Sequence, residues 1–183
     1  KEGTRSDVVR SAAATLGHPF LLCNQVGGND DLLFDGRSLA AWPDGTLVQA
    51  PAWCIGVLLV DTDDPSAAQW LPWPDGTCVP ECTCVVEQVA ADSEPATPAT
   101  GIDLLAAITS GLGDYCRKSG IECIVLGMSG GVDSAVCAAV ACRAMGADNV
   151  LGLAMPSRHS STHSLADAEA TAEALGMELQ EHS

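Results

Sequence analysis

The sequence predicts an α/β protein in two parts. Residues 101–183 alternate strand and helix patterns in the order that makes a parallel, doubly wound sheet. Residues 1–64 begin with one helical pattern, and several short strand patterns separated by turn residues follow it. Residues 65–100 are rich in Pro, Asp, Ser, Thr and Ala, so we expect a linker with some local structure there.

In the first part, apolar spacing predicts a helix over residues 4–16, ended by Gly17 and Pro19. A turn is expected at Gly27 and Gly28, and a hairpin turn at residues 43–45. The expected short strands cover residues 20–24, 32–34, 38–42, 46–50, 54–61 and part of 84–90.

In the second part, helical spacing begins at Ile102, and Gly120 ends that helix. Ser164 and Asp167 can form a capping box for the last helix. The remaining expected elements are strands over 123–126, 150–155 and 177–180 and helices over 134–145 and 165–175.

Charge and hydropathy exclude two classes of partner. The formal net charge is −16 with only eight basic residues, which argues against nucleic acid and anionic membranes. The longest apolar runs, 53–60 and 135–142, are far shorter than the roughly 20 residues that span a bilayer. Residues 1–7 contain no initiator methionine and no apolar signal core, so we interpret this end as a cut inside a longer protein.

The nine cysteines favour a reducing, cytoplasmic setting, because an odd number of them occurs and most lie in apolar stretches as free thiols would. Those stretches contain Cys23, Cys54, Cys123, Cys137 and Cys142. A second group has two interpretations: it supplies three ligands of a zinc or iron–sulfur site, or it belongs to a turn, which its unusual spacing favours. That group is Cys78, Cys82 and Cys84.

A phosphate-binding turn is predicted at residues 124–134, where an apolar run stops at Gly130 and Gly131 and a second one opens after Ser134. Such a turn lets backbone N–H groups approach an anion at the positive end of the next helix. Asp133 stands where a magnesium ion is needed. The turn is not a Walker loop, because no lysine follows at the required spacing.

Residues 155–161 leave the next strand at the same edge of the sheet, so we expect them to face this turn across a ligand crevice. Arg158 is therefore a candidate phosphate partner. His159 and His163, four residues apart, could form a metal pair, but the serine-rich loop around them favours an ordinary loop.

Residues 24–36 are polar and have two interpretations. They form a turn-rich core segment in which Asn24, Asp30, Asp31 and Asp35 make local hydrogen bonds, or they belong to a site. The segment contains no nucleophile beside a base.

Three segments resemble the glutamine-dependent NAD synthetases. Residues 24–36 are similar to Asn-Gln-Val-Gly-Gly-Gln-Asp-Glu-Leu-Val-Phe-Asp-Gly in the glutaminase domain of that family, which belongs to the nitrilase superfamily. Residues 126–134 resemble Leu-Gly-Leu-Ser-Gly-Gly-Ile-Asp-Ser, and residues 155–161 resemble Met-Pro-Ser-Arg-Tyr-Ser-Ser, with His159 in place of the tyrosine. The resemblance runs nearly end to end and is weakest over about residues 65–100.

For the fold, the resemblance implies that residues 1–64 are the C-terminal end of a nitrilase-like α-β-β-α sandwich. Residues 101–183 would be the start of a Rossmann-like sheet of the adenine nucleotide α-hydrolase type, as in the N-type ATP pyrophosphatases. Both parts would be incomplete. The glutaminase cysteine, glutamate and lysine would lie upstream, so no catalytic residue is expected in this chain, and alone it is expected to be an inactive fragment.

For the activity, the resemblance implies a ligase. ATP adenylates the nicotinate carboxylate of deamido-NAD, pyrophosphate leaves, and ammonia from glutamine gives NAD and AMP. Asp133 would bind Mg²⁺ and Lys1 would bind glutamine. The partners would be these small molecules, and a homo-oligomer is expected. The implied ATP-binding residues are Gly127, Met128, Ser129, Gly130, Gly131, Val132, Asp133, Ser134, Met155 and Arg158.

Two other functions are compatible with the phosphate turn. GMP synthetase, or another amidating ligase of the ATP pyrophosphatase type, would share residues 129–134 but not the segment at 24–36. A non-catalytic module would contain the same turn and bind ATP, but it would catalyse no reaction. The 24–36 segment favours the NAD synthetase.

Overall fold

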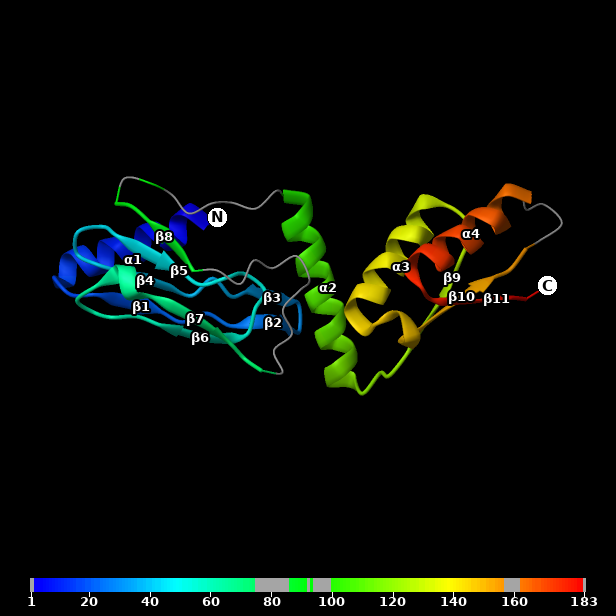
Figure 1. Ribbon diagram of the computed structural model, residues 1–183, viewed down its shortest axis with the longest axis horizontal. Helices are drawn as coiled ribbons and strands as arrows, with labels where there is room; N and C mark the ends of the chain where they lie inside the picture. Colours follow the sequence, from blue (N-terminus) through cyan, green and yellow to red (C-terminus); the bar gives the residue numbers. More distant parts are fainter. Residues whose placement is uncertain (1, 75–85, 92, 94–99, 157–161, 183) are drawn as a thin grey trace. The chain divides into compact units, whose positions relative to one another are not determined.

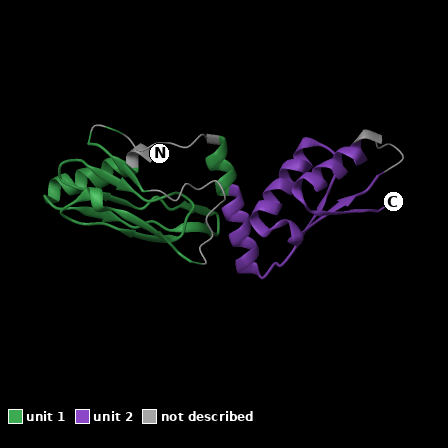
Figure 2. Ribbon diagram, in the orientation of Figure 1, with its two compact units in different colours: residues 1–107 green, residues 108–183 purple. Residues whose placement is uncertain are grey.

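The computed structural model describes the chain except residues 1, 75–85, 92, 94–99, 157–161 and 183. It divides into two compact units, residues 1–107 and residues 108–183 (Figure 2). Each unit has its own core.

Unit 1 combines one long helix with short antiparallel strands (Figure 1). A four-stranded sheet has the order β1-β4-β5-β8, and β2 with β3 and β6 with β7 form two hairpins. The elements are α1 (Glu2–Leu16), β1 (Phe20–Leu22), β2 (Val26–Asn29), β3 (Leu32–Asp35), β4 (Leu39–Ala41), β5 (Leu47–Gln49), β6 (Gly56–Leu59), the 3-10 turn η1 (Pro65–Ala67), β7 (Gln69–Pro72) and β8 (Glu87–Val89).

The four-stranded sheet is covered on both faces because its strand residues alternate between them. On one face, Val9 and Ala13 of α1 pack in a cluster with Leu39 and Leu47. On the other face, the cluster of Ala40, Trp42 and Val48 packs against apolar residues that include Leu58 and Val60. An apolar layer therefore covers each face of this sheet.

The two hairpin turns differ in how well the sequence predicted them. Residues 43–45 join β4 to β5 as predicted, and the Gly45 N–H donates to the Trp42 carbonyl at 2.9 Å. The turn predicted at Gly27 and Gly28 is wrong, because both glycines lie inside β2. The turn falls instead at Asp30, whose φ of +50° is a conformation that aspartate tolerates better than most residues.

Two strands lie within residues 65–100. β8 coincides with the brief strand expected over 84–90, and it pairs with β5. β7 was not predicted, because this stretch of the sequence contains no long periodic segment, and it pairs with β6. Both pairings are internal to unit 1.

Unit 2 is a three-stranded parallel sheet of order β11-β10-β9, which confirms the predicted parallel sheet. Helices α3 and α4 contact each other and the sheet, so both cover the same face (Figure 1). The boundary between the units falls within helix α2. The elements are α2 (Thr100–Ser119), β9 (Ile124–Gly127), α3 (Val132–Met145), the 3-10 turn η2 (Ala147–Asn149), β10 (Val150–Ala154), α4 (Thr162–Leu175) and β11 (Glu178–Glu181).

The core of unit 2 joins the sheet to its helices, with Met128, Ala138, Ala168 and Met177 among its buried members. Close packing requires glycine at position 152, because a β-carbon there would lie 2.8 to 2.9 Å from side-chain atoms of three residues. These residues are Leu179, Met128 and Met177.

The capping box predicted at Ser164 and Asp167 is wrong. Helix α4 begins at Thr162, so Ser164 lies inside the helix. Ser164 and Asp167 match the local sequence pattern of a capping box, but the helix starts two residues before Ser164. Among the helices in the described residues, none is long and apolar enough to cross a membrane.

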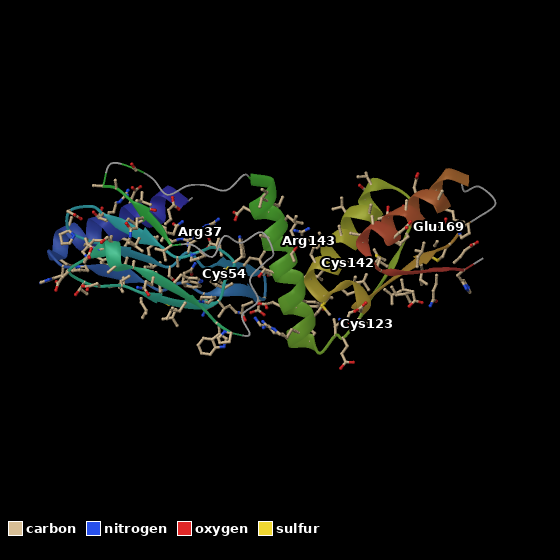
Figure 3. The ribbon with its side chains drawn as sticks, in the orientation of Figure 1. Arg37, Cys54, Cys123, Cys142, Arg143 and Glu169 are labelled. Atoms are coloured by element: carbon tan, nitrogen blue, oxygen red, sulfur yellow. The ribbon has the colours of Figure 1, made fainter. Side chains whose placement is uncertain are left out.

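The cysteines need one correction. Cys54, which Figure 3 labels, was expected to be a free thiol, but it is disulfide-bonded and buried. An apolar sequence context does not distinguish a buried thiol from half of a disulfide. The free cysteines in the described residues are Cys23, Cys116, Cys123, Cys137 and Cys142. Cys78, Cys82 and Cys84 lie outside the described residues, and the residues that are described contain no cluster suited to a metal ion.

Candidate functional site

The predicted phosphate turn lies between β9 and α3, at the carboxyl end of the strand. Gly130 has a φ of +74°, and a β-carbon there would lie 2.1 Å from the carbonyl oxygen of Ser164. Only glycine combines this left-handed backbone with so close an approach. The turn is therefore held against the first residues of α4.

Two serine hydroxyls fix the shape of the turn. The Oγ atoms of Ser129 and Ser134 lie 3.1 Å apart, and Ser134 Oγ donates to the Gly131 carbonyl at 2.9 Å. The Gly131 N–H donates to Ser129 Oγ at 3.2 Å. Both hydroxyls are on the exposed surface of the turn, so they can exchange these partners for a ligand.

Helix α3 begins without a side-chain cap. Its N-cap residue is Gly131, which makes no side-chain hydrogen bond to the first turn of the helix. The N–H groups of that turn and the helix dipole therefore favour an anion at this end. Asp133, in the same turn, is exposed. One exposed carboxylate fits a magnesium ion that a nucleotide brings with its phosphates, because magnesium is commonly held by one or two carboxylates plus phosphate oxygens.

The two predicted loops meet at one cavity of about 140 Å³. The turn contributes Met128 and Ser129, and the loop after β10 contributes Met155 and Pro156. The described part of that loop thus lies beside the turn, as expected from the shared edge of parallel strands. The full lining is Met128, Ser129, Ala154, Met155, Pro156, Ser164 and Leu165.

The predicted site residues differ in what they can offer a ligand. Met128 is buried in the core of unit 2 and also lines the cavity. Val132 and Met155 are 74% and 61% exposed. Arg158 and Lys1, expected to bind phosphate and glutamine, lie outside the described residues, as does His159.

Unit 1 contains a polar network that the sequence reasoning missed. The Asp35 carboxylate accepts hydrogen bonds from Arg5, Arg37 and Asn24 at 2.8 to 3.2 Å. Burial alone would raise the pKa of Asp35, but hydrogen bonds and charge from Arg5 and Arg37 outweigh it, so the pKa lies below its usual value. The interpretation of Asp35 as a purely local cap is therefore wrong.

The same network reaches helix α2. Arg37 Nη2 donates to Asp103 Oδ1 at 2.8 Å, and Trp53 Nε1 donates to the same oxygen at 2.9 Å. Arg37 and Trp53 are both buried and both have positive φ, +50° and +55°. A conformation of this kind costs about 1 kcal/mol or more in a non-glycine residue and persists where surrounding contacts determine it. The one sequence feature that could have drawn attention to Arg37 in this network is that basic residues are scarce, with only eight in the sequence.

The comparisons with known proteins match both halves of the chain. The model of the family described as NAD synthase matches residues 104–183, which contain the turn. The chain is 36% identical over 98% of its length to a glutamine-dependent NAD(+) synthetase of Synechocystis sp. and 40% identical over 96% to that of Rhodobacter capsulatus. The chain belongs to the glutamine-dependent NAD(+) synthetase family. It spans about 29% of the length of each of these two curated relatives.

Solved structures of this family support the same assignment. The structure of a glutamine-dependent NAD(+) synthetase from Acinetobacter baumannii, in complex with ADP, matches 98% of the chain with a TM-score of 0.72 and 28% identity. The chain covers 31% of that protein. A second synthetase, from Cytophaga hutchinsonii, is 18% identical and shares the fold, with a TM-score of 0.61 over the whole chain.

Proposed function

We propose that this chain is part of an enzyme that amidates deamido-NAD to NAD, with ATP as the energy source and glutamine as the nitrogen donor. ATP would activate the nicotinate carboxylate as an adenylate with release of pyrophosphate, and ammonia would then displace AMP. The observation that carries the proposal is the uncapped α3 N-terminus behind a turn with two serine hydroxyls, in the residues that the NAD synthase model matches. The A. baumannii relative, whose structure is a complex with ADP, supports nucleotide binding by a protein of this family.

The turn would bind the pyrophosphate that leaves. We assign Ser129, Gly131 and Ser134 to its oxygens, because their hydroxyl and N–H groups lie together at the helix N-terminus. The benefit is positioning and charge neutralisation, since donors that are already oriented need no reorganisation as charge develops. Ser129 and Ser134 would give up their mutual contact when phosphate arrives.

The rest of the nucleotide would lie along the edge where the strands end. We assign the backbone at Gly127, Met128, Gly130 and Val132 and the side chains of Met155 and Arg158 to the same ATP site. Met155 supports this because it lines the cavity beside Ser129. Asp133 would hold magnesium, which neutralises phosphate charge when bound. Lys1 would hold glutamine.

We assign residues 1–64 to the end of a nitrilase-like glutaminase domain and residues 101–183 to the NAD synthase domain. Within residues 65–100, which we expected to be a linker, β7 and β8 pair with strands of unit 1, so these two strands go with the first part. Support for the first comes from the similarity of the whole chain to glutamine-dependent synthetases. A cytoplasmic homo-oligomer remains our expectation for the full protein.

The test uses the complete reading frame that contains this chain. We expect it to form NAD from deamido-NAD, ATP and magnesium with either ammonia or glutamine, measured by coupled NAD reduction. Failure with both nitrogen donors would reject the proposed activity. NAD formation with ammonia alone would keep the synthetase and reject the glutamine-dependent part.

A further inference from the structure

Asp103 joins two parts of the chain that are far apart in sequence. Its Oδ1 atom accepts from Arg37, 66 residues away, and from Trp53, 50 residues away. Arg37 in turn donates to Asp35, which also accepts hydrogen bonds from Asn24 and Arg5. Four segments of unit 1 are thus connected through the buried Arg37 side chain.

The Arg37 guanidinium joins two carboxylates. Its two Nη atoms each donate at 2.8 Å, one to Asp35 and one to Asp103. A guanidinium presents such donors in a rigid plane, which a lysine does not do. Arg37 and Trp53 both hold left-handed backbones and both donate to the same Asp103 oxygen, so Asp103 is one of the contacts that hold these two side chains.

Helix α2, which contains Asp103, begins in unit 1 and ends in unit 2. Asp103 lies in the first turn of α2, and Ala106, one turn later, packs with Trp53. Farther along the same continuous helix, Leu112 packs against the core cluster that contains Met128. Met128 directly precedes Ser129 of the phosphate turn. Ala106 of α2 therefore packs within unit 1, and Leu112 of the same helix packs within unit 2.

We propose that Asp103 is a positioning residue that fixes residues 24–38 to helix α2, so that the glutamine-dependent reaction depends on it more than the ammonia-dependent reaction does. The proposal rests on the proposed function. Segment 24–38 belongs to the half assigned to glutamine hydrolysis, and α2 leads into the half assigned to NAD formation. Loss of the Asp103 charge weakens its ion pair with Arg37, while the phosphate turn and its core keep their contacts.

The test compares variants of the complete reading frame with two nitrogen donors. We expect Asp103→Asn to lower the glutamine-supported kcat/KM about 10-fold, while ammonia-supported NAD formation changes less than about twofold. Asparagine keeps an oxygen for Trp53 but loses the charge that faces Arg37. Arg37→Lys should give the same pattern, because lysine cannot bridge both carboxylates in one plane.

The matched control is Asp114→Asn on the same helix. Asp114 pairs with Arg117 and Lys118 within α2, so Asp114→Asn removes these ion pairs and leaves the bonds of Asp103 to Arg37 and Trp53 in place. We expect less than a twofold change with either donor. The ammonia rate reports whether the second half of each variant folds, and urea unfolding followed by tryptophan fluorescence reports whether unit 1 folds, because all four tryptophans precede residue 74.

The outcomes separate the two proposals. An unmodified enzyme that makes no NAD with either donor rejects the proposed function and this inference with it. An active enzyme in which Asp103→Asn lowers both rates equally, or neither, rejects the inference alone. A selective loss with glutamine in Asp103→Asn and Arg37→Lys, absent in Asp114→Asn, supports it.

Discussion

The carbonyl oxygen of Ser164 occupies the space that a side chain at Gly130 would need. The ideal β-carbon position of Gly130 lies 2.1 Å from that oxygen. The contact joins the phosphate turn to α4, and with φ of +74° it gives position 130 two separate reasons to be glycine. The two effects can be separated experimentally.

Gly130→Ala should destabilise unit 2 and weaken nucleotide binding. The left-handed backbone and the collision with Ser164 together should lower the free energy of unfolding by about 2 to 4 kcal/mol. Gly176→Ala is the matched control, because Gly176 has a φ of +69° but no atom within 4 Å of its β-carbon position. It should lose only about 1 to 2 kcal/mol. Urea unfolding followed by circular dichroism measures both, and equal losses would contradict the steric explanation.

Ser134→Ala should slow pyrophosphate release without unfolding the protein. The hydroxyl bonds only within the exposed turn, so the free energy of unfolding should change by less than about 1 kcal/mol. Loss of a donor to the leaving group should lower kcat about 10- to 100-fold. Thr171→Val is the control, since it removes a hydroxyl that donates to the Asp167 carbonyl on α4. A normal rate in Ser134→Ala would remove this serine from the site.

Asp133→Asn should raise the magnesium concentration needed for half-maximal activity by about 10-fold, because the nucleotide-bound ion loses a carboxylate ligand. Stability should be unchanged, since Asp133 is exposed. Asp148→Asn, an exposed aspartate in the η2 turn, should leave the magnesium dependence as it was. Magnesium titrations of pyrophosphate release test this prediction, and identical curves for the Asp133 variant and the unmodified enzyme would contradict it.

Asp35 should make unit 1 sensitive to acid. The pKa of Asp35 is lowered in the folded state, so its contribution is complete above the unfolded value of about 3.9 and is lost as pH falls through the folded pKa. At pH 7, Asp35→Asn should cost about 2 to 4 kcal/mol, because it leaves buried Arg37 without one carboxylate.

Tryptophan fluorescence measures that loss in unit 1 alone, because all four tryptophans, at positions 42, 53, 70 and 73, precede residue 74. The difference between the unmodified protein and Asp35→Asn should shrink toward pH 3. Asp31→Asn, at an exposed site in the β2–β3 turn, should show no such trend. A difference that stays constant with pH would mean that the Asp35 charge contributes nothing.

Local signals explain what the sequence predicted well. The parallel sheet and the phosphate turn follow from apolar runs punctuated by Gly130, Gly131 and Gly146, each signal lying within a few residues of its element. The turn between β2 and β3 was misplaced because two adjacent pairs, Gly27-Gly28 and Asp30-Asp31, both favour turns. The pairing of β2 with β3 places the turn at Asp30 and Asp31.

The network in unit 1 could not be predicted in the same way. Arg37 and Asp103 are 66 residues apart, and no local sequence pattern indicates that they interact. Asp35 was recognised as polar and close to a turn, but its partners come from α1 and from the segment after β3. Long-range ion pairs of this kind depend on the packed fold, whereas the sequence pattern that predicts the phosphate turn lies within residues 124–134.

The most direct test of the proposed activity is pyrophosphate release from ATP by the complete reading frame, with glutamine supplied and either deamido-NAD or xanthosine monophosphate as the acceptor. We predict release with deamido-NAD and none above background with xanthosine monophosphate. Release only with xanthosine monophosphate would contradict the account in favour of a GMP synthetase, and no release with either acceptor would contradict catalysis at this site.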